Sequence, residues 1–251
     1  MYRFLAVAVC CAQLLAADST LVGRVLGDIA RTPSGIATEP IPSLVVSSAS
    51  IAAIIWMSGS DDAIRSAVMR SHSPAFNTLA RIGNTLGDVP SAAAVSLALI
   101  VGGAACGSDH TITSGRQLLE ALALAGAVTT TLKLTIGRAR PFRERGDGFF
   151  TPFRWDDAQW SFPSGHTTVA GTIVGIALAR SDNWLVRSAA VLGALTTMTA
   201  RVWSDKHWTS DTIVGATIGS AIGYGLARSD HDAHTWMIVP APDGIGVTAT
   251  W

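Results

Sequence analysis

Three short stretches of the sequence combine permanent positive charges with histidines. The first contains Lys133 and Arg140, the second ends at His166, and the third runs from Arg201 through His207. Three permanent cations that converge on one point need an anion between them, and the planar fork of an arginine matches the oxygens of a tetrahedral anion. We therefore predict a phosphate-binding site wherever the fold brings these stretches together.

The second stretch, Pro163-Ser164-Gly165-His166, is typical of a helix start. Ser164 is a favourable capping residue. The free amides of Gly165 and His166 would then point outward at the positive end of the helix dipole, where phosphate oxygens bind readily. Alone this would be an ordinary helix start, but the accompanying cations favour a phosphate cradle.

The two histidines predict the chemistry. Asp211 follows His207 by four residues, within reach of the imidazole, where a carboxylate would fix the tautomer and orient the ring. The other ring nitrogen would be free to attack phosphorus, and His166 could protonate the leaving alcohol. Water would then hydrolyse the phosphohistidine. Because phosphoryl transfer depends mainly on positioning and charge stabilisation, these groups would be sufficient.

Six apolar segments without sustained alternation are predicted to be helices, and an up-and-down order places alternate ends on one face. We therefore expect an all-α bundle of about six core helices with the site at one end. The segments are 44–57, 92–106, 117–136, 166–180, 185–200 and 212–227.

The connections contain turn residues. We expect a loop from Gly83-Asn84 to Pro90, and the long connection 137–163 has the length of a functional loop. Its additional arginines, Arg138 among them, are expected to be solvated, with guidance of an anionic substrate as the alternative. Pro242-Asp243-Gly244 separates two short apolar runs, which predicts a small C-terminal β-hairpin or a loose tail.

The N-terminus has the features of an export signal. Arg3 precedes a short apolar run that ends in Ala16-Ala17. The predicted organisation is a signal peptide at 1–17, an N-terminal helix and linker at 18–42, a helical phosphatase domain at 43–229 and a tail or hairpin at 230–251. Removal of the signal would leave Cys106 as the one cysteine, so the mature chain could form no internal disulfide.

The three stretches resemble the type 2 phosphatidic acid phosphatase family, which shares its fold with vanadate haloperoxidases and bacterial acid phosphatases. The family pattern KxxxxxxRP, PSGH and SRxxxxxHxxxD is present in order and spacing, with Ala200 in place of the family serine. We expect that replacement to alter the tuning of Arg201 without loss of activity. The resemblance implies that no metal or other cofactor is needed, and it implies the following roles: phosphate binding by Lys133, Arg140, Ser164, Gly165 and Arg201, attack by His207, assistance by Asp211 and acid catalysis by His166.

The predicted function is a metal-independent phosphatase acting on a phosphate monoester or a lipid (pyro)phosphate. The alternatives are a vanadate-dependent haloperoxidase and a non-catalytic anion-binding membrane protein. Zero formal net charge gives no indication of nucleic-acid binding. Mean hydropathy of +0.37 lies between that of soluble and membrane proteins. If six segments crossed after signal cleavage, the site would face the cytoplasm, whereas membrane relatives generally face outward. We therefore expect an exported protein, periplasmic or membrane-associated, with its site facing the periplasm.

Overall fold

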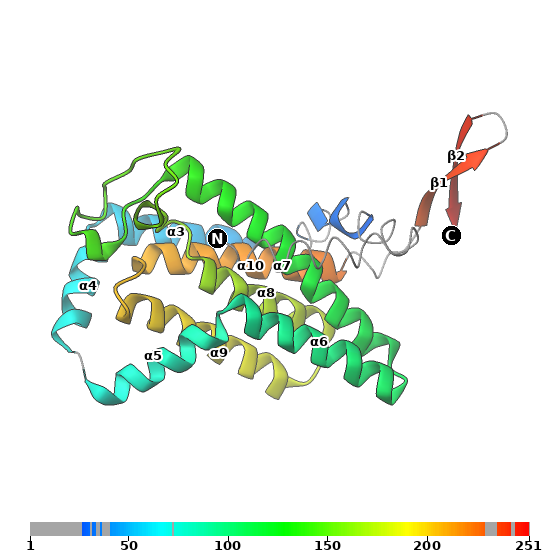
Figure 1. The fold of residues 1–251 in the computed structure, drawn as a ribbon, viewed down its shortest axis with the longest axis horizontal. Coiled ribbons are helices and arrows are strands. Elements are labelled where there is room, and N and C mark those ends of the chain that lie inside the picture. The colour runs from blue at the N-terminus through cyan, green and yellow to red at the C-terminus, as the bar shows by residue number, and fades with distance from the viewer. Residues whose placement is uncertain are drawn as a thin grey trace.

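The computed structural model describes residues 27–30, 32–33, 36, 41–71, 73–228, 235–241 and 244–250. The predicted signal peptide at 1–17 lies outside these residues, as does most of the predicted linker up to residue 40. Short helical stretches occupy 27–30 and 32–33. The described chain is mainly helical, which confirms the all-α prediction (Figure 1).

The six predicted helices correspond to α3 and α6 to α10. Their ends lie close to the predicted ones except at the start of α7, which begins at Asp109 and not at residue 117. The bounds are α3 Ile41–Met57, α6 Val89–Cys106, α7 Asp109–Ile136, α8 Gly165–Arg180, α9 Trp184–Trp203 and α10 Thr209–Arg228. Two short 3-10 helices, Pro141–Arg143 and Asp157–Gln159, lie in the long connection between α7 and α8.

Two further helices, α4 (Ser60–Arg70) and α5 (Pro74–Leu86), were not predicted, and the expected loop at residues 83–90 is wrong. Gly83 and Asn84 belong to the last turn of α5, and α6 begins at Val89. A β-carbon on Gly83 would collide with the carbonyl oxygen of Thr196 in α9. This glycine therefore permits close helix packing and does not mark a turn.

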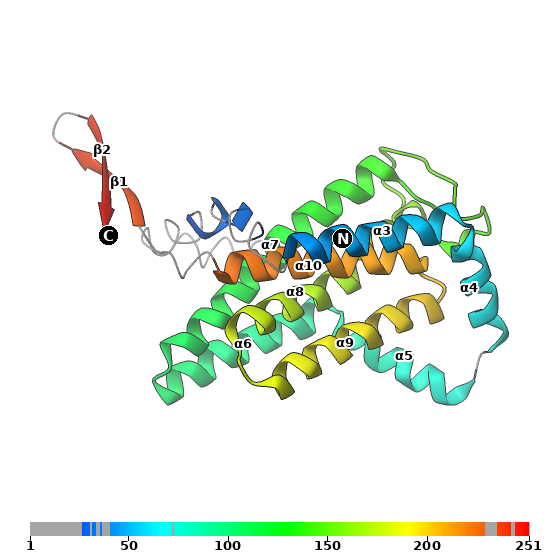
Figure 2. The same cartoon turned by 180° about the vertical axis from the view of Figure 1, so that it is seen from behind.

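Helices α8 and α10 make the closest contact in the bundle, and glycines make it possible. A β-carbon on Gly171 of α8 would collide with the backbone of Ala216, and one on Gly219 of α10 would collide with the carbonyl oxygen of Thr168. Figure 2 shows α3 lying along α10 on the opposite side. The tight α8–α10 pair fixes the N-terminal ends of both helices side by side, and both ends carry predicted site residues.

Much apolar surface is exposed. Helices α6 and α7 are long and apolar enough to cross a membrane, and the pair α3 and α4, bent by 79°, could form a third, broken span. Only 17% of the apolar stretch of α6 and 22% of that of α7 are buried inside the protein. Large exposed apolar side chains also occur on α3, α5 and α9. The bundle therefore has a surface suited to lipid.

The predicted C-terminal hairpin forms from β1 (Thr235–Ala241) and β2 (Gly244–Thr250). The strands pair antiparallel, with Thr235 opposite Thr250 and Ala241 opposite Gly244.

Candidate functional site

The predicted site residues meet at one end of the bundle. The C-terminal ends of α7 and α9 and the N-terminal ends of α8 and α10 lie there together (Figure 1). The positive charges of Lys133, Arg140 and Arg201 each lower the pKa of His166 and of His207. The three cations and both imidazoles therefore share one electrostatic environment, as the alternating helix directions predicted.

His207 is held by a backbone carbonyl. Its Nδ1 lies 2.6 Å from the carbonyl oxygen of Ser161, whereas Asp211 Oδ2 is 4.0 Å away, beyond hydrogen-bond distance. The predicted direct contact between Asp211 and the imidazole is therefore wrong. A carbonyl oxygen can only accept, so Nδ1 carries the proton and Nε2 keeps its lone pair.

Asp211 contacts the residues on either side of the His207 ring and not the ring itself. Its Oδ2 accepts hydrogen bonds from the hydroxyl of Ser161 at 2.5 Å and from the backbone amide of Trp208 at 3.0 Å. Ser161 contacts the imidazole through its carbonyl oxygen, and Trp208 follows His207 in the sequence. Asp211 thus holds both neighbours of His207 in place.

Arg138 is buried, so its predicted solvation is wrong. Its side chain donates to Asp211 Oδ1 at 2.5 Å and to Asp61 Oδ2 at 3.0 Å, and all three side chains are at most 2% exposed. Ser210 donates its backbone amide to Asp61 and accepts a hydrogen bond from Arg138. The buried ring of Trp208 lies 5.5 Å from the guanidinium. This network joins α4, the long connection and the start of α10.

Ser164 occupies the N-cap position of α8, but its side chain makes no capping hydrogen bond, contrary to the prediction. The hydroxyl of Thr168 donates to the carbonyl oxygen of Ser164, and the Ser164 amide donates to the carbonyl oxygen of Asp211. Within the described part of the chain, the buried Ser164 Oγ and Arg201 Nε have no hydrogen-bond partner. Both atoms can donate, and a bound oxyanion would satisfy both.

Each of the three cations has a hydrogen-bond partner that is either uncharged or exposed to solvent. None of these partners fully neutralises the positive charge at the site. Lys133 Nζ donates to the carbonyl oxygen of Trp160 at 2.6 Å, and its stem lies beside Gly165. Arg140 pairs with Asp157, whose side chain is 77% exposed. Arg201 donates to the side-chain oxygen of Asn84 at 2.7 Å.

The pKa values of both histidines are lowered. Burial, with Arg201, Arg140 and Lys133 acting in the same direction, lowers the pKa of His166 to about 3. Burial and the same cations hold the pKa of His207 well below its usual range. Both rings are therefore neutral near pH 7. A neutral His207 suits a nucleophile, whereas His166 can act as an acid only when a bound dianion offsets the cations.

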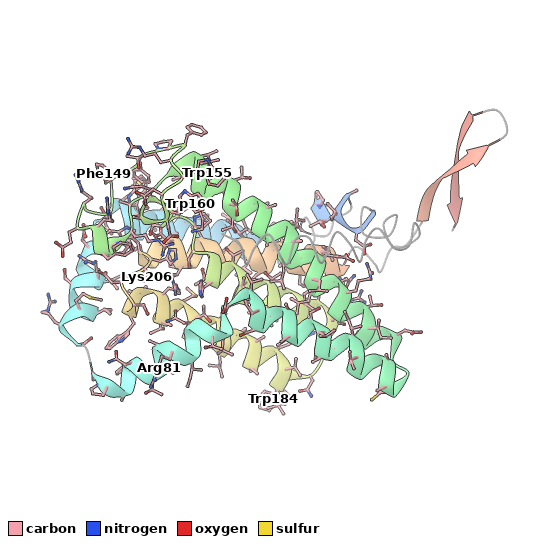
Figure 3. The ribbon with its side chains drawn as sticks, viewed as in Figure 1. Arg81, Phe149, Trp155, Trp160, Trp184 and Lys206 are labelled. Atoms are coloured by element: carbon pink, nitrogen blue, oxygen red, sulfur yellow. The ribbon has the colours of Figure 1, made fainter. Side chains whose placement is uncertain are left out.

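The tryptophans near the site differ in role. Trp203 and Trp208 are buried and pack, whereas Trp155 is 72% exposed and meets Trp160 edge to face. Figure 3 shows Trp155 and Trp160 on the long connection at the site end of the bundle, with Trp184 at the far end of α9.

Ala200 packs against Ala80 of α5 and Trp203, so the position where the family has serine faces α5.

Sequence reasoning missed Asp61, Asn84 and Ser161. Asp61 and Asn84 lie on α4 and α5, the two helices that were not predicted. Ser161 acts through its carbonyl oxygen, which no residue pattern reveals. An acidic residue at the start of α4 was a weak signal for Asp61. Within the described residues, no three His, Cys, Asp or Glu side chains form a group that could hold a metal ion.

The helical bundle, with its cationic histidine site at one end, resembles proteins of the type 2 phosphatidic acid phosphatase class. A model of the PAP2 superfamily matches residues 114–234, a range that contains all the predicted site residues. This match confirms the resemblance seen in the sequence, over the region that it covers.

Individual relatives with the same resemblance match this chain over a short stretch or at low identity. Lipid A 1-phosphatases of Rhizobium etli and Rhizobium johnstonii are 44% and 42% identical over 59 residues, which are 23% of this chain and 25% and 24% of theirs. The match thus spans about a quarter of these relatives. The first transmembrane PAP2-type phosphatidylglycerolphosphate phosphatase structure from Bacillus subtilis aligns with a TM-score of 0.59 and 23% identity. That alignment covers 78% of this chain and 98% of the other, and it supports the fold.

Proposed function

We propose that this protein is a phosphatase that hydrolyses a lipid phosphate ester through a phosphohistidine. One observation carries the proposal: three cations surround two neutral imidazoles, beside two buried donors, Ser164 Oγ and Arg201 Nε, that lack partners among the described residues. A phosphate group would satisfy these donors and balance the charge. Lys133, Arg140, Ser164, Gly165 and Arg201 are the phosphate-binding residues in this proposal.

In the first step, His207 Nε2 attacks phosphorus while Nδ1–H stays bonded to the carbonyl oxygen of Ser161. The bond between phosphorus and the ester oxygen breaks, and His166 gives its proton to the leaving alkoxide. In the second step, water attacks the phosphohistidine, His166 takes the proton of the water, and inorganic phosphate leaves. The three cations stabilise the charge on the equatorial oxygens in both steps.

The apolar surface supports a lipid phosphate as the substrate. Exposed apolar side chains on α3, α5, α6 and α9, with two helices apolar enough to span a bilayer, favour a protein that works at a membrane. The matched curated relatives are named as phosphatases of a lipid. We therefore propose a membrane-associated enzyme, exported by the N-terminal signal, whose site faces the periplasm and requires no metal.

A panel of phosphate esters tests the function. We expect the purified protein in detergent to release phosphate from phosphatidic acid faster than from p-nitrophenyl phosphate. Vanadate, which has phosphate geometry, should inhibit competitively. Oxidation of bromide by peroxide in the presence of vanadate, with no phosphate release from any ester, would instead identify a haloperoxidase.

The pKa of His166 gives a pH prediction. Folding lowers this pKa from about 6.5 to about 3. The unfolded chain therefore binds more protons at acid pH, and this histidine costs stability as pH falls from about 6.5 towards 3. Bound vanadate should raise the His166 pKa, which NMR titration of labelled histidine would detect. A His166 ring that stays neutral at pH 6 with vanadate bound would contradict its role as the acid.

A further inference from the structure

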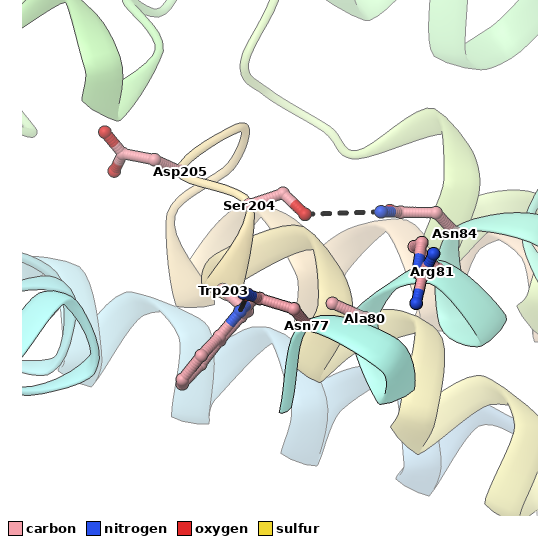
Figure 4. A pocket seen from close by; sticks show the side chains of 7 residues that line it. All are labelled: Asn77, Ala80, Arg81, Asn84, Trp203, Ser204 and Asp205. Carbon is pink, nitrogen blue, oxygen red and sulfur yellow. Dashed lines mark hydrogen bonds between the residues drawn. The ribbon is translucent and has the colours of Figure 1, made fainter. Parts of the chain in front are cut away.

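A cavity of about 420 Å³ opens between α5 and the end of α9 (Figure 4). Helix α5 contributes four residues at helical spacing, so they form one face of that helix. Trp203, Ser204 and Asp205 form the opposite wall. The α5 residues are Asn77, Ala80, Arg81 and Asn84.

The cavity adjoins the phosphate site through Asn84. The side chain of Asn84 accepts a hydrogen bond from Arg201 and donates to Ser204 Oγ at 3.2 Å, so it belongs to both regions. One turn further along, Gly87 packs against the backbone and β-carbon of His166. His207, in contrast, is held by Ser161 of the long connection. Asn84 and Gly87, at the end of α5, thus connect the cavity to the phosphate-binding Arg201 and to His166, the proposed acid for the leaving alcohol.

The lining combines an apolar wall with hydrogen-bonding groups and one available charge. Ala80 and Trp203 form the wall, and the indole of Trp203 donates to Asn77. Asp205 is paired with Arg65. Among the described residues, Arg81 donates to Thr78 and has no carboxylate partner. An apolar wall with a few placed polar groups is typical of small-ligand sites.

We propose that this cavity binds a polyhydroxylated group, a sugar or polyol, that forms the alcohol side of the phosphate ester. The proposal rests on the function proposed above and deepens it. The asparagines, Ser204 and Arg81 would hydrogen-bond the hydroxyls, while Ala80 and Trp203 contact the carbon skeleton. Acyl chains attached to that group would extend towards the exposed apolar residues Phe76, Leu79 and Ile82 of α5. Substrates whose alcohol is a plain hydrocarbon would leave the cavity unused.

Two amphiphilic probes distinguish these cases: N-acylglucosamine 1-phosphate and dodecyl phosphate, both in detergent micelles. Arg81→Gln should raise KM for the sugar phosphate about tenfold, because a charged hydrogen bond is lost, and leave dodecyl phosphate within twofold. Arg81→Lys should recover part of the loss. Arg70→Gln is the matched control, since Arg70 is an exposed arginine on α4 that does not line the cavity.

An equal change with both probes, or no change with either, would overturn the proposal. Calorimetric binding of the sugar phosphate to the His207→Ala variant measures the cavity without turnover, and adding Arg81→Gln should weaken that binding about tenfold. If the wild type released phosphate from neither probe, the proposed function would fail. The binding result would still decide whether the cavity holds the sugar.

Discussion

Replacing His207 with alanine is expected to abolish phosphate release while the protein remains folded. In the proposed mechanism Nε2 of this residue forms the bond to phosphorus, and no other described imidazole has its combination of burial and orientation by Ser161. Loss of a nucleophile typically reduces kcat by about 10⁴-fold or more. Phosphate release from phosphatidic acid in detergent, with circular dichroism of the same samples, measures both parts of this expectation.

His110→Ala is the matched control, because His110 is exposed at the start of α7, away from the site end. It should leave turnover and helicity unchanged. The phosphohistidine itself can be sought by rapid acid-free quenching after mixing with ³²P-labelled substrate, where wild type should retain label and His207→Ala should not. Full turnover by His207→Ala would refute the assigned nucleophile.

Replacing Arg138 with leucine is expected to cost about 3–5 kcal/mol of stability, because it leaves two buried carboxylates without their shared cation. Asp61 and Asp211 are both fully buried, and Arg138 contacts each of them. Burial raises the pKa of Asp211, and Arg138 opposes that shift. Phosphatase activity should fall too, since Asp211 positions Ser161 and Trp208 around His207.

Thermal or denaturant unfolding in a fixed detergent measures this loss. The control is Arg143→Leu, which removes an exposed arginine from the same connection and should change stability by about 0.5 kcal/mol or less. The double variant Arg138→Leu/Asp61→Leu should regain part of the stability, because one unpaired carboxylate is then absent. An Arg138→Leu protein as stable as wild type would show that the buried network does not hold the loop to α4 and α10.

The Arg138 network also explains how a long connection can carry site residues. Arg140 and Ser161 both lie between α7 and α8, in a segment with only two short 3-10 helices. The buried ion pairs of Arg138, and the hydrogen bond from the Trp208 indole to the carbonyl oxygen of Ala139, fix its start to α10. The segment thereby holds Ser161 against His207 although it contains no α-helix.

The sequence determined the helical class, six of the helices and the meeting of Lys133, Arg140 and Arg201 with the two histidines. These followed because apolar runs and capping residues are local signals and alternating helix directions fix which ends share a face. Helices α4 and α5 gave weaker signals. Polar and charged residues interrupt the apolar ones of α4, and the last turn of α5 contains Gly83-Asn84, a pair that is typical of turns.

Only the tertiary structure decided how the site is supported. Distances such as 2.6 Å to the Ser161 carbonyl and 4.0 Å to Asp211 depend on how α8, α10 and the long connection pack, and residue spacing cannot resolve them. The burial of Arg138, the contact of Asn84 with Arg201 and the cavity along α5 likewise join segments far apart in the chain. Residue types set what chemistry was available, and packing set which group touches which.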